Sequence, residues 1–374
     1  MCLVGAPACD GAPVGVPPSL TAGPLVPVPA VAPLEARPAR RCGECHESYL
    51  TEWSGSAHAG SARAPAYQAM RAQAPDAAAC DRCHAPLTAV LDPKEAVVAE
   101  GVTCEVCHAI SEVTLAPEAA SWTLQLAENR KYGPLCDVEE PYFHRAGCSP
   151  LHADSRLCAA CHHLTHTAAG VALPVFSEFE EWQHGDGMRV GLHCQGCHMP
   201  ERALAVASGG PVREGASHHG DGPATGDALA LDVRVRADAD GLQVSGHVHV
   251  SGAPHALPVG LPGRELALVA ELVDGTGVTI ASDVAVYSRV LVDASGAEVP
   301  FFRALRVGAD TRLQPGERRP FVLRLPTAPP GAHVELELLD RPLSAALART
   351  LAIAAPEPKL LQTRRILPPW DRTP

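Results

Sequence analysis

The sequence predicts two structural classes in series: a mostly α-helical or irregular region organised by a repeated motif, then an antiparallel β-sandwich. Three observations support this prediction. Cys-x-x-Cys-His occurs five times between residues 42 and 198. Aromatic residues make up only 4% of the chain, few for a conventional core. From residue 229 onward, short runs alternate apolar and polar residues, which is the pattern of half-buried strands.

The chain has 374 residues, enough for two or three domains, and its composition suggests where they begin and end. We expect a Pro-rich segment at 1–40, a motif-bearing domain at 41–224, an immunoglobulin-like β-sandwich domain at 225–355 and a tail without clear structure at 356–374. Eight prolines between Pro13 and Pro38 exclude a regular helix in the first segment.

The repeated motif is the attachment site for c-type haem. Its five copies, numbered first to fifth along the chain, are Cys42, Cys45 and His46; Cys80, Cys83 and His84; Cys104, Cys107 and His108; Cys158, Cys161 and His162; and Cys194, Cys197 and His198. Each thiol adds to one vinyl group of the porphyrin, and the His supplies one axial nitrogen to the iron. On a helix, positions i, i+3 and i+4 share a face, so all three groups can reach one macrocycle.

Chance does not account for the motif, since these Cys and His frequencies give about 0.025 occurrences in a chain of this length. The main alternative is zinc, because ten cysteines in five pairs could build Cys₄ ribbons. Zinc ribbons do not require His after the second Cys, whereas here it always follows. A thioredoxin-like redox pair would occur singly in a βαβ context. We therefore predict five covalently bound haem c groups, each with an iron atom.

The motif-bearing region is short for the number of groups it would bind. It offers about 37 residues per haem, too few for a separate globular core around each. The haems themselves are therefore expected to form the core of this region, lying close together with their edges nearly touching.

The formal net charge is −12, and an acidic surface argues against nucleic acid and anionic membranes as partners. Redox proteins are the expected electron donor and acceptor, and basic ones would be favoured by charge. No run of eighteen apolar residues exists, so no transmembrane segment is expected.

Covalent haem attachment outside the bacterial cytoplasm implies export, to the periplasm, the outer surface or the extracellular space. Met1 to Leu34 nevertheless lacks the basic start and the unbroken apolar core of a signal peptide. Cys9 is a weak candidate for a lipid anchor.

Segments between the motifs give weaker predictions. A short helix is expected after the first motif, with Trp53 packed on a porphyrin, and Ala62 to Ala79 is expected to be helical. Trp122, Tyr132, Tyr142 and Phe143 are expected to cover haem edges in the long interval between the third and fourth motifs. Cys136 and Cys148 lie in the same interval, either as a disulfide or as two buried thiols.

The second half of the chain predicts about seven strands separated by turns. The expected strands are 229–235, 242–250, 265–272, 279–290, 301–307, 319–325 and 333–338. Asp274-Gly275-Thr276-Gly277 is a hairpin signal between two of them.

Taken together, these features resemble multihaem c-type cytochromes of the cytochrome c-554 type, in the subgroup with a C-terminal β-sandwich. The matching stretches are Trp53-x-x-Ser56-x-His58-Ala59, Gly101-Val102-Thr103 with the third motif, Leu157 with the fourth motif, the fifth motif with Met199-Pro200, and Pro254-His255-Ala256-Leu257-Pro258-Val259-Gly260. In the last, Pro254 and Val259 replace the Gly and Thr of the subgroup. The resemblance spans roughly residues 41–350 and implies haem-mediated electron transfer.

Each haem iron has a sixth coordination position, and its occupant decides between electron transfer and substrate chemistry. The candidate distal ligands are His58, His144, His152, His218 and His255. The resemblance favours His58 and, of the adjacent pair His218 and His219, the first. His255 would fix the β-sandwich against the haem-binding region. His163, His166, His184 and His193 are expected to serve instead as partners of propionates or backbone groups.

Two classes of function fit these residues. The first is an electron carrier, in which five close haems pass electrons between redox proteins. The alternative is a haem-dependent oxidoreductase acting on a small nitrogen or sulfur compound at one haem with an open sixth position. His166, His184 or His193, or Arg130 and Lys131, could then supply acid–base groups. A third possibility is structural, with copies of the chain stacked into an oligomer or filament.

Overall fold

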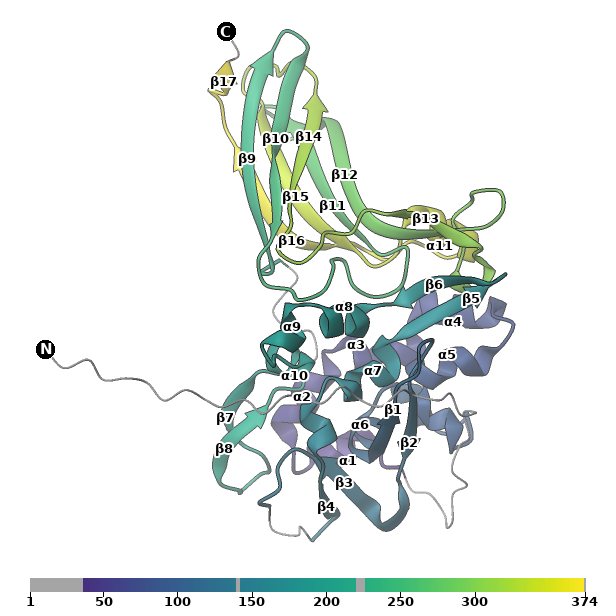
Figure 1. The fold of residues 1–374 in the computed structure, drawn as a ribbon. Coiled ribbons are helices and arrows are strands. Elements are labelled where there is room, and N and C mark those ends of the chain that lie inside the picture. The colour runs from purple at the N-terminus through teal and green to yellow at the C-terminus, as the bar shows by residue number, and fades with distance from the viewer. Residues whose placement is uncertain (1–35, 139–141, 220–225, 373–374) are drawn as a thin grey trace, which may run out of the picture.

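The structure is a computed structural model that describes residues 36–138, 142–219 and 226–372. Predictions that fall on residues 1–35, including the lipid anchor at Cys9, lie outside the described residues. The predicted fold class is confirmed: a region of short helices is followed by a largely antiparallel β-sandwich (Figure 1). In the part of the chain that is described, no helix is long and apolar enough to cross a membrane.

Short helices carry the five motifs. They are α1 (Ala39–Gly43), α5 (Ala77–His84), α6 (Cys104–Ala109), α7 (Arg156–His162) and α10 (Cys194–His198). Local chemistry starts two of them, since the Asp76 carboxylate accepts a hydrogen bond from Ala78 N and the Thr103 hydroxyl accepts one from Glu105 N. The first motif only begins on its helix, because α1 ends at Gly43.

Other short helices connect the motif helices. They are α2 (Glu47–Ser54), α3 (Ala57–Gly60), α4 (Pro65–Gln73), α8 (Glu178–His184) and α9 (Asp186–Arg189). The helix expected over residues 62–79 is in fact two, α4 and α5. Pro65 stands in the first turn of α4, where its missing N–H costs no hydrogen bond, and Ala74 leaves the helix in an extended conformation.

Four two-stranded ribbons surround these helices, and the sequence did not predict them. They are β1 (Ile110–Thr114) with β2 (Ser121–Leu124), β3 (Arg130–Gly133) with β4 (Arg145–Cys148), β5 (Leu164–Ala168) with β6 (Val171–Phe176), and β7 (Glu201–Ala205) with β8 (Val212–Ala216). Strands β3 and β4 run parallel. A disulfide between Cys136 and Cys148 closes their connection, so the disulfide alternative is confirmed.

The second part of the chain forms two packed sheets. One has the order β14-β10-β9-β17 and the other β13-β12-β11-β15-β16. Their strands are β9 (Leu229–Asp238), β10 (Gly241–Val250), β11 (Glu265–Val273), β12 (Thr279–Val292), β13 (Arg306–Asp310), β14 (Arg318–Leu325), β15 (His333–Arg341), β16 (Lys359–Ile366) and β17 (Asp371–Arg372). In the β9–β10 hairpin, Leu231 pairs with Val248 and Val235 with Val244, so buried apolar residues align across the strands.

Three predictions for this part were wrong. Residues 301–307 are not a single strand: Phe301–Arg303 is a 3₁₀ turn after Pro300, and β13 starts at Arg306. The tail is not without structure, because β16 adds a strand beside β15 and β17 pairs with β9. A helix α11 (Ala345–Leu351) was missed. It is capped by the Ser344 hydroxyl, which accepts a hydrogen bond from Leu347 N.

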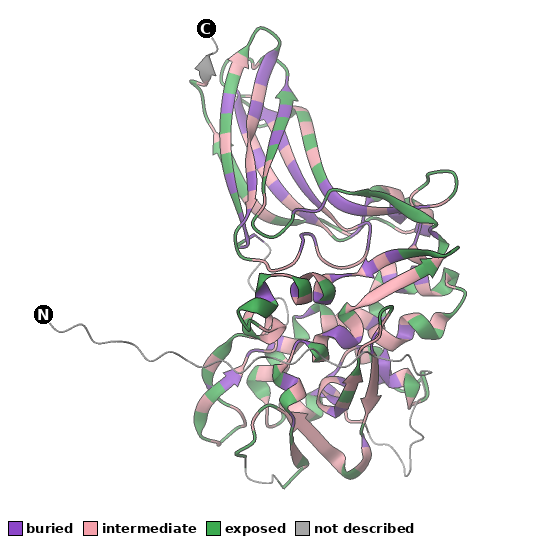
Figure 2. Ribbon diagram, in the orientation of Figure 1, coloured by how far each residue is buried: buried purple, intermediate pink, exposed green. Residues whose placement is uncertain are grey.

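Burial differs between the two parts (Figure 2). The β-sandwich alternates buried and exposed residues along its strands around one continuous apolar cluster drawn from both sheets. In the motif-bearing region most residues of the ribbons are only half-buried, and the apolar clusters are smaller.

Candidate functional site

The cysteines of the five motifs are all free thiols, and each is half-buried. None is used in a disulfide, in contrast to Cys136 and Cys148. A half-buried thiol is held by its helix yet remains open to a reactant on one side, which is the condition that thioether formation with a porphyrin vinyl group requires.

Cysteines of different motifs contact one another. Cys104 donates a hydrogen bond to Cys42, which raises the pKa of Cys104 and lowers that of Cys42. The third motif therefore lies against the first.

The fourth motif has two such neighbours. Cys161 donates to Cys83 of the second motif, and this hydrogen bond lowers the pKa of Cys83. Cys158 donates to Cys194 of the fifth motif, which lowers the pKa of Cys194 to about 7. Cys107 of the third motif is also close enough to both Cys158 and Cys161 to raise their pKa values. The fourth motif thus adjoins three others.

Two motif histidines are oriented by backbone carbonyls. His46 Nδ1 lies 2.6 Å from Val206 O, and His108 Nδ1 lies 2.6 Å from Tyr132 O. Because a carbonyl oxygen only accepts, each Nδ1 must carry the hydrogen, which leaves the lone pair on Nε2. Burial, reinforced by nearby His218, lowers the pKa of His108 to about 3. The neutral ring with a free Nε2 is the form that binds a metal ion.

Each of four motif histidines has a second histidine ring at a nearly constant distance. The ring centroids are 6.3 Å apart for His46 and His144, 6.4 Å for His162 and His58, 6.2 Å for His198 and His255, and 6.0 Å for His108 and His218. An imidazole nitrogen binds a transition-metal ion at about 2 Å, so two rings that share one ion have centroids about 6 Å apart. The side chains therefore fit the axial ligation of a haem iron.

His108 has a second candidate partner, His152, at 5.9 Å. The two candidates differ in their hydrogen bonds. His218 directs Nδ1 to Ala216 O at 3.0 Å, and no described residue hydrogen-bonds its Nε2. His152 directs Nε2 to Cys107 O at 2.9 Å, and its buried Nδ1 has no hydrogen-bond partner among the described residues. His218 therefore has Nε2 available for a ligand role, whereas His152 has only Nδ1. Burial lowers the pKa of both rings.

His84 of the second motif has a different neighbour. In the described part of the chain, Tyr67 rather than a histidine stacks on its ring, with centroids 4.5 Å apart and planes at 20°. The Tyr67 hydroxyl donates to Asp81 at 2.5 Å, and Arg71 also binds that carboxylate. Burial, together with the Asp81 hydrogen bond, raises the pKa of Tyr67 above its ordinary value. No sequence pattern indicated this Tyr–Asp–Arg cluster.

His255 reaches the motif-bearing region from the loop between β10 and β11. Carboxylates of α8 hold this loop, since Glu181 accepts a hydrogen bond from Ala256 N at 2.9 Å and Glu178 accepts one from Gly260 N. Glu181 also binds Arg312 at 2.7 Å. Burial raises the pKa of Glu181, but the Arg312 hydrogen bond and charge outweigh it, so the net shift is downward. A largely buried ion pair therefore joins the β-sandwich to the region of the motifs.

The remaining histidines near the motifs have different neighbours. His163 Nε2 contacts Ala116 O at 2.9 Å, and His193 accepts a hydrogen bond from Ser155 N at 3.2 Å. His166 packs edge-on against Phe301. The side chains of Tyr142 and Phe143 are 94% and 65% exposed. Among the described residues, no group of three or more His, Cys, Asp or Glu side chains is arranged to hold a metal ion by itself.

Comparison with known proteins agrees with the resemblance drawn from the motifs. Residues 41–109, which contain the first three motifs, match the family model described as cytochrome c554 and c-prime. The structure is similar to the crystal structure of a penta-heme cytochrome c552 from Thermochromatium tepidum, with a TM-score of 0.67 and 22% sequence identity over 88% of this chain and 98% of that one. No curated protein matches the sequence.

Proposed function

We propose that this chain, a multihaem cytochrome similar to cytochrome c554, is an exported electron carrier with five c-type haems that transfers electrons between redox partners. The observation that carries the proposal is the coincidence of five Cys-x-x-Cys-His motifs with histidine pairs spaced for axial ligation. Haem, when bound, supplies a one-electron redox centre, and this chain's residues hold, space and tune it.

The ten motif cysteines would attach the porphyrins, and the motif histidines His46, His84, His108, His162 and His198 would each bind one iron. The second histidine at an iron would be His144 at the first motif, His218 at the third, His58 at the fourth and His255 at the fifth. This assignment rests on the ring distances, and at the third motif also on the free Nε2 of His218.

The thiol contacts support close spacing of the centres. The first motif adjoins the third, and the fourth adjoins the second, third and fifth. Electron transfer between partners needs a continuous series of close centres, and this series runs from the first motif through the third to the fourth, where it branches. The motif-bearing unit is taken as residues 41–224. The immunoglobulin-like unit, expected at 225–355, is extended to include β16 and β17, which pair with its sheets.

Haem content and redox exchange test the proposal. Pyridine haemochrome analysis of exported, purified protein should give five haems per chain. Potentiometric titration should then show all five taking up and releasing electrons reversibly. A protein with fewer haems, or with haems that do not exchange electrons with one another, would contradict the proposed carrier role.

A second candidate function is an oxidoreductase of a small nitrogen or sulfur compound, and one observation favours it. Among the described residues, no second histidine ring contacts His84, whereas each of the other four motif histidines has one about 6 Å away. The second haem would then have a sixth position open to substrate. Electron paramagnetic resonance of the oxidised protein distinguishes the candidates: a high-spin signal altered by cyanide or nitric oxide supports the oxidoreductase, and only unaltered low-spin signals remove it.

The proposal also concerns localisation. A protein with covalent haem would lie in the periplasm, on the outer surface or outside the cell. A lipid anchor would be tested by cell fractionation, and assembly into an oligomer or filament by light scattering. Its partners are redox proteins rather than nucleic acid.

A further inference from the structure

We propose that the surface formed by Arg37, Arg40, Arg41, Tyr142 and Phe143, the α1 face, docks an acidic redox protein and exchanges electrons with it at the first motif. This inference rests on the electron-carrier function proposed above and identifies the chemistry of one of its partners. It differs from the expectation drawn from net charge alone, which favoured basic partners.

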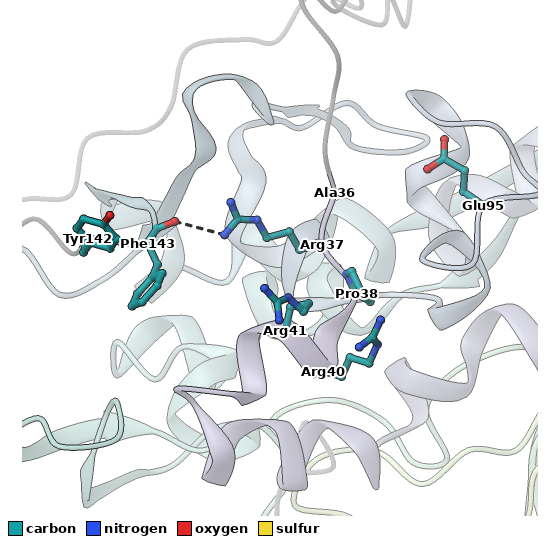
Figure 3. A pocket seen from close by; sticks show the side chains of 8 residues that line it. All are labelled: Ala36, Arg37, Pro38, Arg40, Arg41, Glu95, Tyr142 and Phe143. Atoms are coloured by element: carbon teal, nitrogen blue, oxygen red, sulfur yellow. Dashed lines mark hydrogen bonds between the residues drawn. The ribbon is translucent and has the colours of Figure 1, made fainter.

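The α1 face is a shallow hollow with a volume of about 710 Å³ (Figure 3). Arg40 and Arg41 extend from α1, and Arg37 lies between that helix and the segment of Tyr142 and Phe143. The Arg37 guanidinium donates a hydrogen bond to Phe143 O at 3.3 Å, and Asn129 Nδ2 donates to the same oxygen at 2.7 Å. Two side chains thus fix the aromatic segment beside the cationic helix.

The charge of this face differs in sign from the net charge of the chain. Among the described residues that line it, three guanidinium groups meet one carboxylate, Glu95, whereas the chain as a whole carries −12. Arg41 forms an ion pair with Glu44 at 2.5 Å, so Arg37 and Arg40 contribute most of the net positive charge of the face. A positive face on an acidic protein attracts an acidic partner, whereas the rest of the surface repels it. The partner is therefore oriented toward the positive face.

Exposed aromatic rings supply the other half of a docking surface. Tyr142 and Phe143 contact each other edge to face, with ring centroids 5.2 Å apart, and neither is covered by the described residues. Tyr, Phe and Arg are the residues enriched in protein–protein interfaces, where they act as anchors. A small anion would use the arginines alone, so the two exposed rings favour a protein as the occupant.

The α1 face lies beside the first motif, so a partner docked there would be close to the first haem. Helix α1 contains Cys42 of the first motif, and Phe143 directly precedes His144, whose ring lies 6.3 Å from His46. Both segments of the face therefore run into residues assigned to the first haem. Through its thiols this motif contacts only the third among the described motifs, so it stands at the end of the series, where electrons would enter or leave.

The test uses the five-haem protein and flavodoxin hydroquinone, an acidic one-electron donor, in stopped-flow reduction at low and high ionic strength. The variant is R40E/R41E, and the matched control is R236E/R364E. The control reverses two exposed arginines on β9 and β16 and gives the same net charge. Dithionite reduction of each protein is measured in parallel, because it reports the redox competence of the haems with a small anion.

At low ionic strength we expect R40E/R41E to be reduced by flavodoxin about tenfold more slowly than the control, with the difference vanishing at high salt. Dithionite rates should differ much less. Equal flavodoxin rates in variant and control would overturn the proposal. An equal loss with dithionite would also overturn it, because the face would then attract small anions without docking a protein. Haems that dithionite cannot reduce would instead contradict the electron-carrier function itself.

Discussion

The two regions of this molecule solve the problem of a hydrophobic core in different ways. Of the twelve largest fully buried side chains among the described residues, only Leu87 and Leu173 precede residue 226. The β-sandwich therefore stabilises itself with its own aliphatic side chains. The motif-bearing region has short helices, half-buried ribbons and half-buried cysteines instead, and needs another apolar component to complete its interior.

A prosthetic group can take the place of the apolar side chains that would otherwise form a core. A porphyrin is larger and flatter than any side chain, and covalent attachment makes it part of the chain before folding ends. The low aromatic content of this protein then follows, since the haems would supply the large planar groups. The two regions should consequently respond in opposite ways to loss of haem and to loss of aliphatic side chains.

The largest effect is expected when haem attachment is prevented. Protein produced without cytochrome c maturation should lose the structure of residues 36–219, because its interior would lack most of its apolar material. The β-sandwich should persist, because its core contains no motif residue. Limited proteolysis should leave a resistant fragment that starts near residue 226, and equal digestion of both halves would contradict this expectation.

A core truncation in the β-sandwich should have the converse effect. Leu268 is fully buried in the main cluster, so Leu268→Ala should lower the free energy of unfolding of this part by about 2–5 kcal/mol. The haem absorbance of the folded protein should not change. Val322→Ala, at a position that is 56% exposed on β14, is the control and should cost less than about 0.5 kcal/mol. Unfolding in denaturant, followed both by fluorescence and by haem absorbance, distinguishes the stability of the β-sandwich from that of the motif-bearing region.

The sequence alone predicted some elements of the fold and missed others. The spacing of the motif predicted the attachment residues, because the two cysteines and the histidine of one site are close together in the sequence. Alternation located β9 to β12, β14 and β15 because one face of each is buried. Ribbons such as β3, half-buried along its whole length, show no alternation to detect. Helix α11 has only seven residues, too few for a periodic signal.

The pairing of histidines could not be predicted because it depends on contacts between distant segments. His218 lies beside His108, and His255 lies beside His198, only after the chain has folded. The resemblance singled out His58 and His218, but it could not say which iron each faces. It also gave no indication that Tyr67 would stack on His84.

The joint between the regions should show a smaller, pH-dependent effect. Glu181→Gln removes the charge that binds Arg312, and should destabilise the intact protein by about 1–3 kcal/mol at neutral pH. The folded pKa of Glu181 is lowered, so its contribution is full above its ordinary pKa of about 4.3 and is lost as the pH falls through the folded value. The difference between wild type and variant should therefore shrink below about pH 4.

Thermal unfolding from pH 7 to pH 3 measures this difference. Glu180→Gln is the matched control, because Glu180 lies on the same helix with an exposed side chain. A difference for Glu181→Gln that stays constant down to pH 3 would show that the charge is not what joins the two regions.

The smallest expected change affects one haem and little of the stability. His218→Ala should convert about one fifth of the iron from low spin to high spin, because the third haem loses its distal ligand. His152→Ala should leave the spin state unchanged, since His152 Nε2 is bonded to Cys107 O. Electron paramagnetic resonance of the two oxidised variants makes the comparison. A high-spin signal in His152→Ala alone would reverse the assignment.

We infer that haem bound covalently at every motif would form the interior of the first region and carry its redox function. Intact mass spectrometry of the exported protein after denaturation tests this inference. We predict a mass equal to the mature polypeptide plus five haem groups, with the ten motif cysteines unreactive toward thiol reagents. A mass equal to the polypeptide alone, with those ten thiols alkylated, would contradict the account.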